Sequence, residues 1–330
     1  MLTLVGAGSV GITLASYLAA AGKPLKLYVR PRDREVFAAA DGLRLDLPDG
    51  GSLKASLPPL SDHLVDADTR YLLIATKFGA LEGLLDDLEH HVGHGGEGIT
   101  IVSTLNGVRG VQRIRERLPK AQVAVLTIMF NAQHPAPLHA QLTTKPAVIL
   151  SGHDARLRAL FSGTGLRLSR AKDDEACWGK LLINLANAIG ALTHSTFRDL
   201  LSNPDLRAVF VAALDEAVDR LHASHIAYKL PMPLPYPGYR WLLLHGGTLP
   251  WKLAQLKNGL ADGAYPSMVS DVRAGRRTEV RQLNGEIVAL GEHLNWPAPV
   301  NAKLVELVEA LQQPLQPAFT AASLRSAVMA

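Results

Sequence analysis

Cysteine is nearly absent from this sequence of 330 residues, which has only Cys177. One cysteine excludes an intrachain disulfide and disfavours a zinc site built on several thiolates. Cys177 lies in an apolar stretch, where a small core residue is a better interpretation than a nucleophile. We therefore expect a protein of a reducing compartment and place it in the cytoplasm.

Several classes of partner are disfavoured by what the sequence lacks. No apolar run is long enough to span a bilayer, and the chain opens on a strand-like run rather than on a basic region with a cleavable apolar segment. The formal net charge is only +4, and no long basic run occurs. Twelve histidines are present, but there is no HExxH motif and no close histidine pair on one helix face beside carboxylates. We expect no membrane, nucleic-acid or metal partner, and leave a homodimer open.

The length and the order of the patterns predict two domains. A chain of 330 residues with 48% hydrophobic residues exceeds one typical core. Strand-like and helical runs alternate up to about Lys172, and helical periods dominate beyond it. We predict an α/β, Rossmann-type dinucleotide-binding domain over 1–172 and an all-α, substrate-binding and catalytic domain over 173–330.

A glycine-rich turn follows the first predicted strand, Leu2–Val5, and opens a helix that ends before Gly22. A second strand, Pro24–Val29, completes the βαβ order in which GxGxxG indicates dinucleotide binding. The first glycine permits the tight turn, the second lets backbone approach a pyrophosphate, and the third lets helix and strand pack closely. The helix N-terminus then faces the phosphates. The predicted contacts are Gly6, Gly8, Ser9, Val10 and Gly11.

Three polar residues follow predicted strands. Arg30 ends the second strand, where an arginine suits the 2′-phosphate of NADP(H) and an acid would suit NAD. Lys77 follows the strand Tyr71–Ala75, and Asn106 follows Ile99–Ser103. Ligands of open α/β sheets bind beyond the carboxyl ends of strands, so Lys77 and Asn106 are predicted to line the cofactor edge. The alternative interpretation of Arg30 is a solvated surface arginine. The alternative for Lys77 and Asn106 is that both are ordinary loop residues.

The remaining elements are predicted from periodicity and turn residues. The α/β part should add a hairpin of Leu43–Leu47 and Leu53–Leu57, strands at Val123–Ile128, Gln141–Thr144 and Ala147–Leu150 that extend the sheet, and a helix at Asp154–Ser162. The helical part should contain helices from Asn203-Pro204 to about His222, at Arg240–His245, Trp251–Lys257, Thr278–His293 and Val300–Leu311, a proline-rich connector at Leu230–Gly238, and a loosely held tail from Gln312.

The stretch Glu175–Leu192 reads as an almost wholly apolar helix with three polar exceptions. Lys180, Asn184 and Asn187 stand at i, i+4 and i+7, so they share one stripe of the helix. A polar seam on a buried helix costs free energy unless it meets partners or a ligand. The stripe thus indicates a catalytic or binding face; the alternative is a core helix whose lysine reaches the surface.

A second polar constellation lies in Tyr265–Gly285. Ser267 is placed to cap a helix through Asp271, and Glu279 lies just inside the next predicted helix. Gly285 falls within that helix, where a glycine usually marks close packing. Taken alone, Ser267 is a cap and Glu279 a carboxylate at a helix start.

Together these motifs resemble the ketopantoate reductase family (2-dehydropantoate 2-reductases). The matching pieces are GAGSVG at the start, TK at Thr76-Lys77, LNG at Leu105–Gly107, KLLIN at Lys180–Asn184 and PSM..D...GR.TEV..LNG at Pro266–Gly285. The likeness extends to about Leu311, and its last two motifs are much more specific than the first. It implies reduction of ketopantoate to pantoate with NADPH, on the route to pantothenate, in a cleft between a Rossmann domain and a helical domain.

The resemblance also implies roles for single residues. By motif position, Lys180 is similar to the general acid and Glu279 to the carboxylate that holds a substrate hydroxyl. Asn184 and Ser267 match substrate-binding positions, and Asn187 lies beside another.

On the cofactor side, Lys77 and Asn106 match family positions, and Asn106 is also assigned to the substrate. The glycine loop and Arg30 match the contacts to the NADPH phosphates.

An ammonium can stabilise and protonate the oxyanion that hydride addition creates. Among apolar neighbours the pKa of Lys180 should fall, and a nearby glutamate should oppose that fall.

Three departures from the family pattern keep other functions open. The position eight residues after the lysine is Ala188 rather than the common asparagine, and Arg281 stands where many members have aspartate. The segment 129–137, MFNAQHPAP, differs from the family's glycine-rich segment. They motivate a second hypothesis, an NADP-dependent reductase of another 2-oxo acid or an opine-type dehydrogenase. A third is an NADP-binding regulator without turnover.

Overall fold

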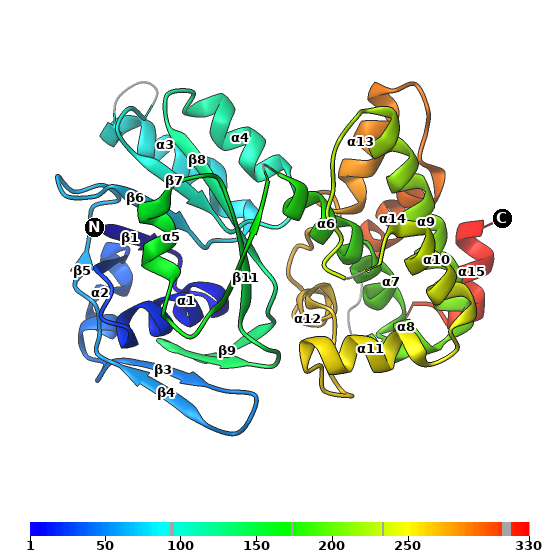
Figure 1. Ribbon diagram of the computed structural model, residues 1–330, viewed down its shortest axis with the longest axis horizontal. Coiled ribbons are helices and arrows are strands. Elements are labelled where there is room, and N and C mark those ends of the chain that lie inside the picture. Colours follow the sequence, from blue (N-terminus) through cyan, green and yellow to red (C-terminus); the bar gives the residue numbers. More distant parts are fainter. Residues whose placement is uncertain (93–95, 173, 233, 312–317, 330) are drawn as a thin grey trace. The chain divides into compact units, whose positions relative to one another are not determined.

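The structure is a computed structural model that describes residues 1–92, 96–172, 174–232, 234–311 and 318–329 (Figure 1). The chain divides into two compact units, Met1–Asp173 and Asp174–Ala330, which are described one at a time. No helix of the described residues is both long and apolar enough to cross a membrane.

An eight-stranded sheet forms the centre of the first unit, in the order β12-β11-β8-β7-β6-β1-β2-β5. Every neighbouring pair is parallel except β8 with β11. The strands are β1 (Leu2–Val5), β2 (Leu25–Tyr28), β5 (Leu60–Ser61), β6 (Tyr71–Ile74), β7 (Thr100–Ser103), β8 (Gln122–Ile128), β11 (Ala147–Ser151) and β12 (Arg167–Ala171). The chain runs outward from β1 to β2 and β5, then returns to β6 on the other side of β1. The order therefore reverses between β1 and β6, which is the topological switch point of a Rossmann-type sheet, and the predicted fold class is confirmed.

Both faces of this sheet are covered, which explains why its strands are apolar at successive positions. Side chains alternate between the faces of a strand. Leu4 and Leu73 point into the core under α1 (Ser9–Ala20) and α5 (Ala155–Phe161). Val5 and Ile74 point into the core under α3 (Leu81–Val92) and α4 (Arg109–Arg117).

A second sheet of four strands, in the order β4-β3-β10-β9, packs against α1 on the side away from β1 and β2. Its strands are β3 (Leu43–Asp46), β4 (Ser52–Ala55), β9 (Ala132–Ala136) and β10 (His139–Leu142). The predicted hairpin is confirmed as the antiparallel pair β3–β4. The expectation that 141–144 extends the main sheet is wrong, because β10 pairs with β3 and β9 instead. The unit also contains η1 (Pro31–Asp33), α2 (Arg34–Ala38) and η2 (Phe78–Ala80).

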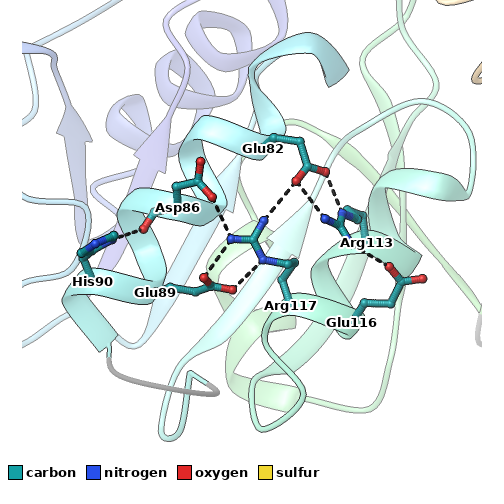
Figure 2. Close-up of polar contacts among 7 residues, drawn as sticks. All are labelled: Glu82, Asp86, Glu89, His90, Arg113, Glu116 and Arg117. Atoms are coloured by element: carbon teal, nitrogen blue, oxygen red, sulfur yellow. Dashed lines mark hydrogen bonds and ion pairs between the residues drawn. The ribbon is translucent and has the colours of Figure 1, made fainter.

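Charged side chains join α3 to α4 on the surface of the first unit, as Figure 2 shows. Arg117 donates to Glu89 at 2.6 Å and to Asp86 at 2.8 Å, and also reaches Glu82 at 3.1 Å. Arg113 donates to the same Glu82 at 2.7 Å. Carboxylates of one helix therefore neutralise arginines of the other, and these hydrogen bonds raise the pKa of the Arg117 guanidinium.

The second unit is wholly helical in its described residues. Its helices are α6 (Glu175–Asn184), α7 (Ala186–Thr193), α8 (Phe197–Ser202), α9 (Pro204–Ala223), α10 (Tyr236–His245), α11 (Leu249–Asn258), α12 (Ser267–Arg273), α13 (Asn284–His293), α14 (Pro299–Glu309) and α15 (Ala321–Met329). The start of α9 follows the sequence prediction, because the Asn203 side chain accepts hydrogen bonds from Asp205 N and Leu206 N.

Three expectations about this unit are wrong. The helix predicted from Thr278 begins only at Asn284, after a series of turns. The proline-rich connector ends earlier than expected, since α10 already begins at Tyr236. The predicted tail contains α15, which packs against α9 and buries Leu324; its first residues, 312–317, lie outside the described part.

Candidate functional site

The glycine loop has the geometry that a dinucleotide requires. Gly6 has φ +106°, and a Cβ there would lie 2.5 Å from the Ala75 carbonyl oxygen. A Cβ on Gly11 would lie 1.8 Å from the Gly6 carbonyl oxygen, so the helix could not pack on the loop. Around a Cβ on Gly8, no atom lies within 4 Å. Gly6 and Gly11 are therefore needed by the fold. Gly8, between them, leaves space where a ligand can approach the backbone.

The helix that follows this loop offers its N-terminus to an anion. Gly8 is the N-cap of α1 in extended conformation, and no side chain caps the helix. Its first turn, which begins with Ser9 and Val10, contains no acidic residue. A twelve-residue helix with an open start binds phosphate through backbone N–H groups and its dipole. The residues present thus fit the pyrophosphate of NADP(H).

The other predicted cofactor residues follow strands next to the switch point. Lys77 comes after β6 and is the N-cap residue of η2, where its side chain is exposed. Asn106 comes after β7 and is half-buried. Arg30 comes after β2, is exposed, and donates to Asp33 at 2.9 Å. Since β1, β2, β6 and β7 are parallel neighbours, these residues and the glycine loop share one edge of the sheet.

In the second unit, α6 and α7 form an almost continuous helix, with only Leu185 between them. Leu185 N still lies 3.1 Å from Leu181 O, so the stripe of Lys180, Asn184 and Asn187 continues across the junction. Lys180 and Asn184 are half-buried, and Asn187 is 5% exposed. Within the described ranges, no hydrogen bond satisfies the side chains of these three residues, so the polar seam is open to a ligand.

Burial lowers the pKa of the Lys180 ammonium from its usual 10.5 to about 8, and the Glu279 carboxylate and Cys177 oppose that fall. Ala176 and Cys177, which lie one turn earlier on the same side of the helix, are both buried, so the lysine stem lies in an apolar part of the unit. Both sequence expectations about this lysine, a lowered pKa and an opposing glutamate, are present in the structure. A half-buried ammonium with a pKa near neutrality is an effective proton donor.

Glu279 and Ser267 are placed differently from the sequence expectation. Glu279 lies in the turn before α13 rather than inside a helix. Ser267 is the first residue of α12 and is exposed; the N-cap is Pro266, and no side chain caps the helix. The predicted serine cap is therefore wrong, because the helix begins one residue earlier than a cap at Ser267 allows.

Close packing of α12 on α7 brings Ser267 to the polar helix. A Cβ on Gly190 would lie 2.8 Å from Pro266 Cγ and 3.4 Å from Val269 Cγ2. Gly190 is one turn beyond Asn187, so the start of α12 lies close to the stripe. The second unit thus gathers Lys180, Asn184 and Asn187 with Glu279 acting on the lysine, and it places Ser267 on the adjoining helix.

One glycine beside the lysine was not singled out in the sequence. A Cβ on Gly179 would lie 1.8 Å from the Lys229 carbonyl oxygen, and Lys229 N donates to Glu175 O at 2.9 Å. The segment after α9 therefore packs directly on the backbone of α6. A glycine in the middle of an apolar helix was the available signal.

Two of the departures from the family pattern leave no unpaired polar side chain for a ligand. Ala188 is fully buried, so its side chain offers no surface to a ligand. Arg281 is exposed, and its guanidinium pairs with the carboxylate of Glu309 on α14. Most of 129–137 forms β9, an edge strand of the small sheet.

A dinucleotide-binding α/β unit, joined to a helical unit that presents a desolvated lysine influenced by a carboxylate, defines a class of nicotinamide-dependent oxidoreductases. Residues 2–156 match the family described as "Ketopantoate reductase PanE/ApbA", and residues 174–312 match "Ketopantoate reductase PanE/ApbA C terminal". The chain belongs to the ketopantoate reductase family, whose members use NADPH.

Relatives of known name cover nearly the whole chain. The 2-dehydropantoate 2-reductase of Pyrobaculum aerophilum is 26% identical over 314 residues, which are 94% of this chain and 97% of the relative. That of Vibrio cholerae is 26% identical over 328 residues, with 94% and 98% covered. Among solved structures, a PanE/ApbA family ketopantoate reductase from Ralstonia eutropha has a TM-score of 0.76 at 23% identity, with 94% of this chain and 98% of that chain covered.

Another similar structure is that of a D-mandelate dehydrogenase with NADH and anilino(oxo)acetate. It has a TM-score of 0.77 at 20% identity, with 94% of this chain and 98% of that chain covered. At such identities the likeness shows the shared fold.

Proposed function

We propose that this protein reduces 2-dehydropantoate (ketopantoate) to pantoate with NADPH, a step of pantothenate biosynthesis. The observation that carries the proposal is the open polar seam on α6 and α7, in which Lys180 is desolvated and Glu279 acts on its charge. The names of the relatives support the substrate, since the similar curated proteins are 2-dehydropantoate 2-reductases.

The role of Lys180 in this reaction is to supply a proton. The dinucleotide supplies a hydride to the ketone carbon when it is bound, and negative charge then develops on the ketone oxygen. The Lys180 ammonium stabilises that charge and donates its proton to the oxygen, which leaves neutral lysine to be reprotonated from water. With a pKa of about 8, the group is mostly protonated near neutral pH and loses its proton readily.

The remaining polar groups orient the substrate. Asn184 and Asn187 point from the same stripe as the lysine, so their amides are available to the substrate's carboxylate and carbonyl groups. Ser267 and Asn106 are further proposed contacts. The Glu279 carboxylate accepts a hydrogen bond from the substrate's hydroxyl and keeps the lysine charged.

The choice of NADPH over NADH is assigned to Arg30. It is exposed after β2, where a 2′-phosphate would extend from the ribose, and it is held by Asp33 through a 2.9 Å contact. Arg30→Ala should raise KM for NADPH by roughly tenfold or more and leave KM for NADH nearly unchanged. The matched control is Arg34→Ala, since Arg34 is also exposed and pairs with Asp62 instead. Equal losses with both cofactors would contradict this role.

A second candidate is another 2-oxo acid with a bulkier side chain. The observation that favours it is the D-mandelate dehydrogenase likeness, because that protein holds anilino(oxo)acetate in a fold as similar as that of a ketopantoate reductase. The buried Ala188 and the paired Arg281 weaken the case that the sequence departures made for it.

The test is oxidation of NADPH with ketopantoate, compared with a panel of branched and aromatic 2-oxo acids and with NADH. A kcat/KM for ketopantoate that exceeds the others by a wide margin supports the proposal, and a better bulky substrate selects the second candidate. Lys180→Ala should lower turnover by about three orders of magnitude or more with cofactor binding intact. Near-normal turnover in that variant would exclude the proton-donor role.

A further inference from the structure

A chain of buried polar side chains lies behind the turn that carries Glu279. Asn284 and Asn301 are both 0% exposed, and Glu216 is 9% exposed. Asn284 Nδ2 donates to Asn301 Oδ1 at 3.1 Å, and Asn301 Nδ2 donates to Glu216 Oε2 at 2.8 Å. Asn284, Asn301 and Glu216 therefore form a polar chain that connects α13, α14 and α9 through side-chain hydrogen bonds.

The Glu216 end of this polar chain is firmly held. The Glu216 carboxylate accepts Val300 N at 2.8 Å and Asn301 N at 2.9 Å, which satisfies backbone donors in the first turn of α14. Asn301 Nδ2 also donates to Ala213 O of α9 at 3.0 Å. Asn301 thus has two fixed partners, both on α9, before it accepts the hydrogen bond from Asn284.

The near end leads directly to Glu279. Gln282 N donates to Glu279 O at 3.1 Å, and Gly285 N donates to Val280 O at 3.0 Å. These bonds close a compact turn between Glu279 and the first residues of α13, of which Asn284 is the first. The hydrogen bond from Asn284 to Asn301 therefore fixes the point at which this turn joins the start of α13.

Packing alone does not explain an asparagine at this position. Its Oδ1 atom is buried, and within the described parts of the chain it has no hydrogen-bond partner. An unpaired buried acceptor is costly, and an apolar residue of similar volume would avoid the cost. The sequence marked Gly285 for close packing, but a Cβ there would lie 3.4 Å from the nearest atom, Arg281 Cβ, so tight packing at Gly285 does not explain the conformation either.

We propose that Asn284 is a positioning residue, which holds the Glu279 carboxylate in place beside Lys180 through its hydrogen bond to Asn301. The inference rests on the proposed function, because the value of that placement is that it tunes a proton donor. Within the described residues, the groups that act on the Lys180 charge are Glu279 and Cys177. Loosening the turn weakens the effect of Glu279, so the pKa of Lys180 should fall further.

The test variant is Asn284→Leu, which keeps the branched shape of the side chain and removes the donor to Asn301. Expected are a kcat/KM for ketopantoate that falls by about tenfold or more and an alkaline limb of the kcat profile that moves to lower pH, as in Glu279→Gln. In the double variant Glu279→Gln with Asn284→Leu, no further movement of the limb is expected. Both changes remove the same interaction, that of the Glu279 carboxylate with Lys180. Asn284→Ser serves in the same way if the leucine variant does not fold, since serine is too short to reach Asn301.

The matched control is Leu304→Ala, since Leu304 is fully buried on α14 but is not part of the polar chain. It should lower the melting temperature and leave the alkaline limb in place. The proposal is overturned if the Asn284 variants lose stability but keep the wild-type limb, or if their effect adds fully to that of Glu279→Gln.

A second readout separates this inference from the proposed function. The pKa of Lys180 is titrated by NMR of ¹³C-dimethylated protein, with the resonance assigned by its absence in Lys180→Arg. A lower pKa in the Asn284 variants supports the positioning role even if ketopantoate is not the substrate. An unchanged pKa refutes the role whatever the protein reduces.

Discussion

Replacing Lys180 by methionine should stabilise the protein near neutral pH while it abolishes reduction. Burial lowers the pKa of Lys180 to about 8 in the folded protein, whereas the unfolded chain has the usual 10.5. Between these values the unfolded chain binds more protons than the folded one, so wild-type stability rises with pH across this window. Below about pH 8 the folded state bears the full cost of a desolvated ammonium.

The size of the effect follows from the same two values. A displacement of the pKa from 10.5 to about 8 corresponds to roughly 3 kcal/mol of unfolding free energy. Methionine has a similar length and no charge, so it fills the space of the lysine stem without that cost. The gain in Lys180→Met should therefore approach roughly 3 kcal/mol near pH 7 and vanish above about pH 10.5.

Urea denaturation of both proteins at a series of pH values measures this difference. The difference between variant and wild type is the useful quantity, because the other titrating groups are common to both and cancel. A Lys180→Met protein that is no more stable than wild type near neutral pH would show that Lys180 is well solvated. Lys180 would then not be part of a buried polar seam, whatever an assay of turnover shows.

Other predictions concern the loop, the surface network and a cap. Gly8→Ala should fold normally and bind NADPH at least about tenfold more weakly, whereas Gly11→Ala should lose much of its stability; fluorescence titration and thermal melts distinguish the two. Arg117→Met should lower the urea midpoint, and that loss should shrink by about half or more in 1 M NaCl if ionic contacts are responsible. Asn203→Ala should cost about 1 kcal/mol of unfolding free energy, and an unchanged midpoint would show that the cap on α9 contributes nothing.

The part of the fold that the sequence predicted best is the part with strong local rules. The strand, glycine turn, helix and strand at the start have one physical solution, because Gly6 and Gly11 each exclude a side chain. The helix after Asn203-Pro204 was predicted at the correct start, because an asparagine cap followed by proline leaves few alternatives. The stripe of Lys180 and Asn184 was visible because helical spacing alone puts the two residues on one face.

The errors arose where distant contacts decide the local structure. The sequence 278–283 has helical residues, yet the chain turns there and α13 starts only at Asn284, whose side chain bonds to Asn301 on another helix. The strand β10 has no local feature that would assign it to the small sheet rather than to the large one. The end of the chain was predicted to be a loosely held tail, but Leu324 of α15 is buried where that helix packs on α9.

The candidate site was predictable in its residue types but not in its environment. Spacing placed Lys180 on a stripe, but the degree of its desolvation depends on the packing of the whole helical unit. Arg281 looked like a change in the substrate region, and only the structure shows that its partner is Glu309. An exposed ion pair of this kind leaves no periodic signal in a sequence.

The position of α1 between the two sheets has a consequence for the thermodynamics of cofactor binding. From Gly11 to Leu18 every residue of α1 is buried, so the loop at its start is attached to a helix that is packed on both sides. A loop anchored in this way has little conformational freedom to lose when a dinucleotide arrives. Binding should therefore carry a small entropic penalty from the protein, and most of its heat should come from phosphate contacts formed on a surface that is already in place.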